Sequence, residues 1–145
     1  MTWIRTIDYE EAKGELRKLY DRIMGPDDNV DNIMLAHSLR PHTLRGHMGL
    51  YKSVLHHSRN RLATWFMEAL GVYVSRLNRC AYCEAHHFEG MRRQLGDNAH
   101  AAAIRIAFDC GQPASMFDAR ECAALAYATL LTESPAEVSA ADVTS

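Results

Sequence analysis

The 145-residue chain lacks several features, and each absence argues against a class of protein. It has no alternating run of β-branched residues and no Asn-Gly turn, which argues against a β-sheet. No apolar run approaches the roughly 20 residues that a membrane-spanning helix needs. The net charge of −2 offers no cationic surface for nucleic acid or an anionic membrane. We therefore expect no nucleic-acid partner and no membrane partner.

The N-terminal stretch, MTWIRTIDYEEAKGE, lacks the apolar centre of a secretory signal and becomes acidic early. We therefore expect a cytoplasmic protein. In a reducing cytosol, four cysteines are not expected to form a structural disulfide framework. A CxxC motif there is more typical of a redox centre or a metal site. The length fits a single domain, 1–145, with its own hydrophobic core.

Helical periodicity runs through nearly the whole chain and predicts an all-α fold. The first helix is expected to begin with Asp8 as its N-cap and to end at 25–28. Further helices are expected at about 32–39, 42–57, 61–77, 81–95, 98–108 and 117–132. Pro41 is expected to stop the short second helix. Ser139 and Asp142 have the spacing of a capping box, with no helix expected after them.

The predicted helix 61–77 is apolar around its whole circumference, which is typical of a buried helix. From Leu62 to Ser75 it reads LATWFMEALGVYVS, in which Glu68 alone carries a charge. A buried carboxylate costs free energy unless it has a partner. We therefore expect Glu68 to have a specific partner in the interior, and His87 is the candidate.

Glu68, Cys80, Cys83 and His87 together form the motif E-x11-C-x2-C-x3-H. On a helix with about 100° per residue, the last three fall within roughly 60° of one another. His86 lies about as far from Cys83 but farther from Cys80. His87 is therefore the preferred partner of the thiols, and His86 is the fallback.

This motif contains the chemical groups that a dithiol redox centre needs. A helix N-terminus lowers the pKa of a thiol, and a neighbouring imidazole can take its proton. One thiolate can attack a peroxide to give a sulfenic acid, and the other thiol can condense with it to a disulfide. An external dithiol must then restore the pair. The helix dipole favours Cys80 as the attacking thiol, whereas the i,i+4 relation to His87 favours Cys83.

Two alternatives stay open for the same residues. Cys80, Cys83, His87 and Glu68 are a possible zinc set, although the chain has no second CxxC. A non-enzymatic redox-sensing subunit would use the same dithiol. Cys110 and Cys122 lie in apolar helical surroundings and are interpreted as small core residues. The sequence itself requires no haem, flavin or metal.

The motif resembles that of the AhpD-like alkylhydroperoxidase branch of the carboxymuconolactone decarboxylase family. The stretches Asn32-Ile33, 36–42, His47 and Leu50-Tyr51 are similar to the N-terminal portion of its peroxidase-related subgroup. The resemblance covers about residues 8–132. It implies an all-helical bundle that assembles as trimers or hexamers and reduces peroxide, with a lipoylated or thioredoxin-like protein as the reductant.

The resemblance also implies a role for each motif residue. Cys83 would attack the peroxide, Cys80 would resolve the product, and His87 with Glu68 would relay protons. The founding peroxidases carry a histidine immediately before the second cysteine, and this chain has Tyr82 there. Tyr82 is therefore expected to serve as an accessory hydrogen-bonding group.

Overall fold

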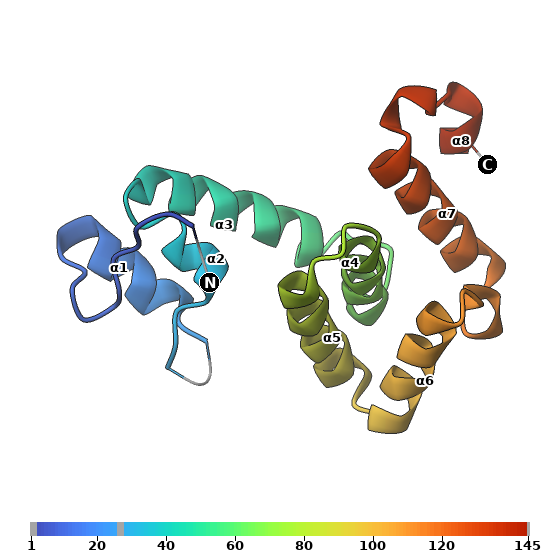
Figure 1. Ribbon diagram of the computed structural model, residues 1–145, viewed down its shortest axis with the longest axis horizontal. Coiled ribbons are helices and arrows are strands. Elements are labelled where there is room, and N and C mark those ends of the chain that lie inside the picture. Colours follow the sequence, from blue (N-terminus) through green and yellow to red (C-terminus); the bar gives the residue numbers. More distant parts are fainter. Residues whose placement is uncertain (1–2, 26–27, 145) are drawn as a thin grey trace. The chain divides into compact units, whose positions relative to one another are not determined.

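The computed structural model describes residues 3–25 and 28–144, and every regular element among them is a helix (Figure 1). The all-α prediction is therefore confirmed for the described part of the chain. The chain divides into two compact units, Met1–His57 and Ser58–Ser145. The expectation of a single domain stays a prediction. No helix among the described residues combines the length and the apolarity needed to cross a membrane.

The first unit contains α1 (Gly14–Ile23), α2 (Asn32–Leu35) and α3 (Pro41–Leu55). Its core forms where α1 packs against α3, around buried side chains that include Tyr20 and Leu44. The Tyr20 hydroxyl donates to the carbonyl of Ile7 at 2.9 Å, and the Ile7 N–H donates to the buried Ser38 hydroxyl at 2.9 Å. These two bonds attach the N-terminal segment to the core.

The predicted start of the first helix at Asp8 is wrong. Residues 8–12 form a turn, in which the Ala12 N–H donates to the Asp8 carbonyl at 3.0 Å. The helix begins only at Gly14, whose φ of +58° lies in the left-handed region that glycine adopts without strain. That conformation separates the turn from α1. Near Pro41 the prediction also fails in detail, because α2 ends at Leu35 and Pro41 is the first residue of α3.

The second unit contains α4 (Thr64–Leu77), α5 (Ala81–Leu95), α6 (Asn98–Asp109), α7 (Ala119–Glu133) and α8 (Ala140–Thr144). Short 3-10 turns, η1 (Pro113–Ser115) and η2 (Pro135–Glu137), precede α7 and α8. The predicted bounds of α5 match the structure. The predicted absence of a helix after Ser139 is wrong, because the Asp142 carboxylate accepts from the Ser139 N–H and hydroxyl and caps α8.

Helix α4 is the central element of this unit, as its apolar circumference predicts. None of its residues is exposed, and it packs against α5 and α7. The helix begins three residues later than expected, because Ala63 is extended and acts as the N-cap. The surrounding core includes Phe66, Val72, Met91 and Ile104. Burial of α4 fixes the position of Glu68, whose side chain it carries into the interior.

Candidate active site

The turn between α4 and α5 places both motif cysteines at the start of α5. Arg79 adopts a left-handed conformation with φ +54°, and the Cys80 N–H donates to the Ser75 carbonyl at 2.8 Å. This closes α4 in the manner of a helix C-cap and reverses the chain within a few residues. Cys80 becomes the N-cap residue of α5, and Cys83 lies in the first turn.

The two thiols face each other at a distance suited to redox chemistry. Their sulfur atoms lie 2.9 Å apart and share a hydrogen bond, and both residues are free thiols of intermediate exposure. A disulfide bond is about 2.05 Å long, so less than 1 Å of movement separates the pair from bonding distance. The structure thus brings together the Cys80–Cys83 pair that the spacing predicts.

The environment gives the two thiols opposite acidities. The hydrogen bond with Cys83 lowers the pKa of Cys80, the backbone of Cys83 and then of Tyr82 lowers it further, and burial acts in the opposite direction. The hydrogen bond with Cys80, then burial and the neighbouring charge, raise the pKa of Cys83 to about 11. Cys80 at the N-cap is therefore the more acidic of the two thiols.

Glu68 and His87 form the predicted pair across the α4–α5 interface. His87 Nδ1 lies 2.7 Å from Glu68 Oε2, within hydrogen-bond distance, and Glu68 is only 6% exposed. A buried carboxylate of this kind fixes the orientation of an imidazole and leaves Nε2 for proton exchange. His87 lies one turn after Cys83 on α5, so the relay and the dithiol share one helix.

Two glycines that the sequence prediction overlooked make room for this pair. A Cβ on Gly71 of α4 would lie 2.5 Å from Cγ of His87. A Cβ on Gly90 of α5 would lie 2.8 Å from Cδ of Glu68. Each glycine therefore borders the partner contributed by the opposite helix. The only sequence signal for this role is a glycine inside a helix, where it is otherwise unfavourable.

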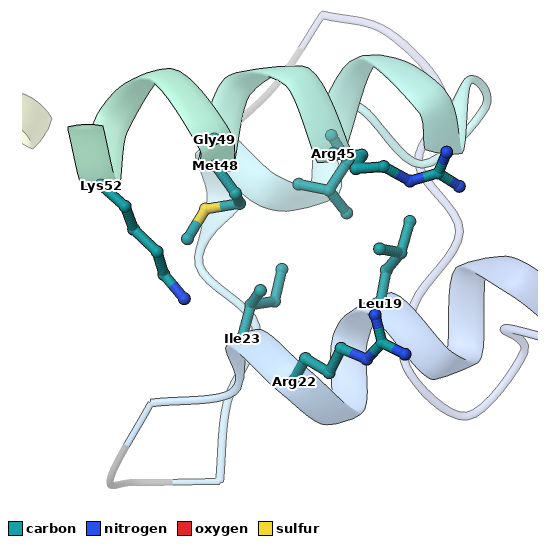
Figure 2. Close-up of a pocket in the computed structure, with 8 residues that line it drawn as sticks. Leu19, Arg22, Ile23, Arg45, Met48, Gly49 and Lys52 are labelled. Carbon is teal, nitrogen blue, oxygen red and sulfur yellow. The ribbon is translucent and has the colours of Figure 1, made fainter. Parts of the chain in front are cut away.

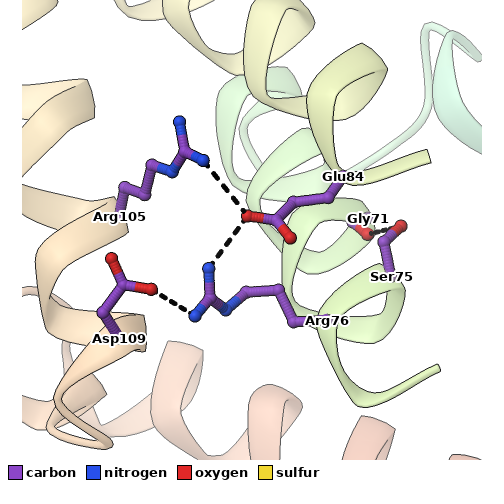
Figure 3. A network of polar contacts seen from close by, with 6 residues as sticks. All are labelled: Gly71, Ser75, Arg76, Glu84, Arg105 and Asp109. Atoms are coloured by element: carbon purple, nitrogen blue, oxygen red, sulfur yellow. Dashed lines mark hydrogen bonds and ion pairs between the residues drawn. The ribbon is translucent and has the colours of Figure 1, made fainter. Parts of the chain in front are cut away.

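An ionic network fixes the first turn of α5 against its neighbours (Figure 3). Arg76 of α4 bonds Glu84 of α5 at 2.9 Å and also pairs with Asp109 of α6. Arg105 of α6 approaches Glu84 at 3.7 Å. Arg76 and Glu84 are 25% and 20% exposed, so this contact is partly shielded from water. Because Glu84 follows Cys83 directly, the network holds the segment that carries the thiols.

The accessory candidates lie beside each other on the outer side of α5. The rings of Tyr82 and His86 stack with centroids 6.3 Å apart, and His86 meets His87 edge-on at 6.2 Å. Tyr82 is 41% exposed. His87 also bonds Glu68, and the two motif thiols contact each other. The four motif residues thus form two pairs, and Cys83 and His87 lie one turn apart on α5.

Cys110 and Cys122, the two cysteines outside the motif, differ in their exposure. Cys110 is exposed, so the interpretation of it as a core residue is wrong; it lies just after α6, where the helix ends at the surface. Cys122 is partly buried, and its sulfur lies 3.6 Å from the Phe117 carbonyl. In the described part of the chain, no three His, Cys, Asp or Glu side chains gather as ligands for one metal ion. The four-residue zinc set is therefore not assembled in this structure.

Comparison of the chain with protein-family models and with curated proteins finds no match. The geometry of the α4–α5 site and its chemistry are therefore the basis for inferring a function.

Proposed function

We propose that this protein is a thiol-dependent peroxidase of the alkylhydroperoxidase type. The observation that carries the proposal is the arrangement on α5, where a close thiol pair at the helix N-terminus is followed one turn later by a histidine on a buried carboxylate. The lowered pKa of Cys80 favours its thiolate, which is the nucleophilic form. The His87–Glu68 pair supplies a general acid and base.

The reaction takes place in three balanced steps. The thiolate attacks the terminal oxygen of ROOH, the O–O bond breaks, and the alkoxide takes a proton to leave as ROH, which produces a sulfenic acid. The second thiol then attacks that sulfur, and hydroxide leaves as water with the proton of the thiol. Finally an external dithiol reduces the Cys80–Cys83 disulfide by exchange and is itself oxidised to a disulfide.

We assign the first attack to Cys80, in contrast to the order that the family resemblance implies. Cys80 has the lowered pKa and the N-cap position, whereas the pKa of Cys83 near 11 keeps it protonated at neutral pH. Resolution then requires a base for Cys83. His87, one turn further along α5 and oriented by Glu68, is placed to act as this base.

The proposal extends to the assembly and the electron donor. Large apolar side chains remain exposed, among them Leu50 on α3, Ile106 on α6 and Leu131 on α7. Such surface favours self-association, so we propose a homo-oligomer, a trimer or a hexamer. We propose a lipoylated or thioredoxin-like protein of the cytoplasm as the reductant. Light scattering coupled to gel filtration measures the assembly directly.

The deciding experiment follows peroxide consumption by metal-free protein with dihydrolipoamide as reductant. We expect turnover, with a loss of two hydrogens localised to Cys80–Cys83 by peptide mass spectrometry. A reversible disulfide without turnover would refute the peroxidase and fit a redox sensor. Unreactive thiols with one tightly held zinc would fit a metal-binding subunit.

Single-turnover trapping with dimedone tests the order of attack. We expect the sulfenic acid on Cys80 in the Cys83→Ser variant and little reaction at Cys83 in the Cys80→Ser variant. The opposite pattern would restore the order implied by the resemblance. Both variants should lose steady-state turnover, because each lacks one of the two thiols that form the disulfide.

A further inference from the structure

A concave site lies in the first unit, between α1 and α3, and contains none of the redox residues. We name it the α1–α3 groove. Its floor is apolar and consists of Leu19, Ile23, Leu44 and Met48. Leu19 and Leu44 are buried core residues, so the floor is a continuation of the packed interior. The groove encloses a volume of about 200 Å³.

The rim of the α1–α3 groove is cationic. Arg22 on α1 and Arg45 and Lys52 on α3 line it, and no acidic residue does. Figure 2 shows these three side chains around the space between the two helices. Arg45 pairs with Glu15. Neither Arg22 nor Lys52 has an ion-pair partner among the residues that the structure describes.

We propose that the α1–α3 groove binds a small amphiphilic carboxylate, a free medium-chain fatty acid anion. The apolar floor suits an alkyl chain, and the cations at the rim suit one carboxylate. At about 30 Å³ per water-sized group, 200 Å³ holds about six or seven such groups, which matches a short alkyl chain. Drug-sized ligands and nucleotides need about 300–1,000 Å³.

The charge of the ligand distinguishes a fatty acid anion from the neutral alcohol of the same chain length. Arg22 and Lys52, which have no ion-pair partner among the described residues, attract an anion and gain nothing from an alcohol of the same chain length. Because both are exposed, each is expected to contribute roughly a two- to fivefold gain in affinity. The contribution must fall at high salt, because the screening length shrinks from about 10 Å at 0.1 M to about 3 Å at 1 M. The proposal does not depend on the peroxidase proposal, because the two sites share no residue.

The test is a calorimetric titration of the full chain with octanoate, with the 13C-methyl signals of its methionines observed in parallel. We expect saturable binding that shifts the signal of Met48, which lines the groove, and leaves that of the buried Met91 in the second unit unchanged. Octanol keeps the alkyl chain but lacks the charge, and acetate keeps the carboxylate but lacks the long chain. Each should therefore bind more weakly than octanoate.

Three variants locate the binding. The double variant Arg22→Gln, Lys52→Gln should weaken the binding of octanoate. Lys18→Gln should not, because Lys18 is an exposed residue of α1 that does not line the groove. Gly49→Phe should block it, because a Cβ at this groove-lining position meets no atom within 4 Å and the side chain can extend into the groove. Helix content by circular dichroism verifies that each variant is folded.

Several results would overturn the proposal. Absence of saturable binding at millimolar octanoate would do so, as would equal affinity for octanol. Binding that survives Gly49→Phe would place the ligand elsewhere. Binding of an acidic amphipathic Leu/Glu peptide, but not of octanoate, would replace the fatty acid with a protein partner.

Discussion

Gly71→Ala tests directly whether the His87–Glu68 pair performs the proposed proton transfer. The added Cβ would lie 2.5 Å from Cγ and 2.6 Å from Nδ1 of His87, whereas ordinary contacts begin at 3.4 Å. The ring must therefore retreat by about 0.9 Å, the difference between 3.4 and 2.5 Å. Nδ1 is also the atom that bonds Glu68 at 2.7 Å, so that bond is lost. A displacement of about 1 Å costs on the order of 10²-fold in rate.

Gly90→Ala applies the same perturbation to the other partner. Its Cβ would lie 2.8 Å from Cδ and 2.9 Å from Oε2 of Glu68. We expect a loss of peroxide turnover of similar size, because the carboxylate can no longer hold the imidazole. Gly46→Ala is the matched control, since Gly46 also lies inside a helix and a Cβ there meets nothing within 4 Å. It should retain full activity and gain slightly in stability.

The assay is steady-state peroxide consumption with dihydrolipoamide, combined with a double-mutant cycle. In the His87→Ala background the ring is gone, so Gly71→Ala should cost little more, and the two losses should be far from additive. Unchanged turnover in a folded Gly71→Ala variant would refute the reasoning. An equal loss in Gly46→Ala would show that the effect is a general one on the fold.

Four further predictions concern the thiols and the ionic network. Alkylation of Cys80 by iodoacetamide, followed by peptide mass spectrometry, should rise with pH and level off below the ordinary thiol range, whereas alkylation of Cys83 should keep rising towards a pH of about 11. Cys83→Ala should move the Cys80 midpoint upward, because it removes the hydrogen bond that stabilises the thiolate, and an unmoved midpoint would contradict the assigned cause. Arg76→Ala should lower the free energy of unfolding by about 1 kcal/mol in urea titration, whereas Arg93→Ala, at a more exposed pair, should change it by less than about 0.5 kcal/mol. Replacing Cys110 and Cys122 together by Ala should leave peroxide turnover intact, and loss of turnover in a folded double variant would show that the redox centre extends beyond one CxxC.

Local signals explain why some helix bounds could be predicted. Helix α5 was predictable at its C-terminal end because Gly96 follows it with φ +64°, the usual left-handed residue after a helix. Helix α1 was not, because Asp8 offers an N-cap signal that is equally suited to a turn. The left-handed conformation of Gly14 separates a turn at Asp8 from the start of the helix. The helical periodicity of the sequence does not reveal a positive φ.

In the candidate site, too, some contacts could be predicted from the sequence and others could not. The Glu68–His87 contact was predictable although the residues are 19 apart, because one buried carboxylate needs one partner and the motif supplied it. The Arg76–Asp109 pair, 33 residues apart, was not predictable, since many surface charges offer an equivalent partner. The spacing of Cys80 and Cys83 predicts their proximity but not which thiol has the lower pKa.

The proposed order of thiol attack therefore depends on where the turn before α5 ends. If Cys80 lay inside the helix, its amide neighbours would be bonded to earlier carbonyls and would not stabilise a thiolate. At the N-cap, the backbone of Tyr82 and Cys83 is available to it, while Cys83 remains one turn before His87. One chain reversal, with Arg79 at φ +54°, thus separates the acidities of two cysteines that the motif alone leaves equivalent. A change at Arg79 that moves the start of α5 away from Cys80 should accordingly raise the pKa of the Cys80 thiol, which the pH dependence of its alkylation measures.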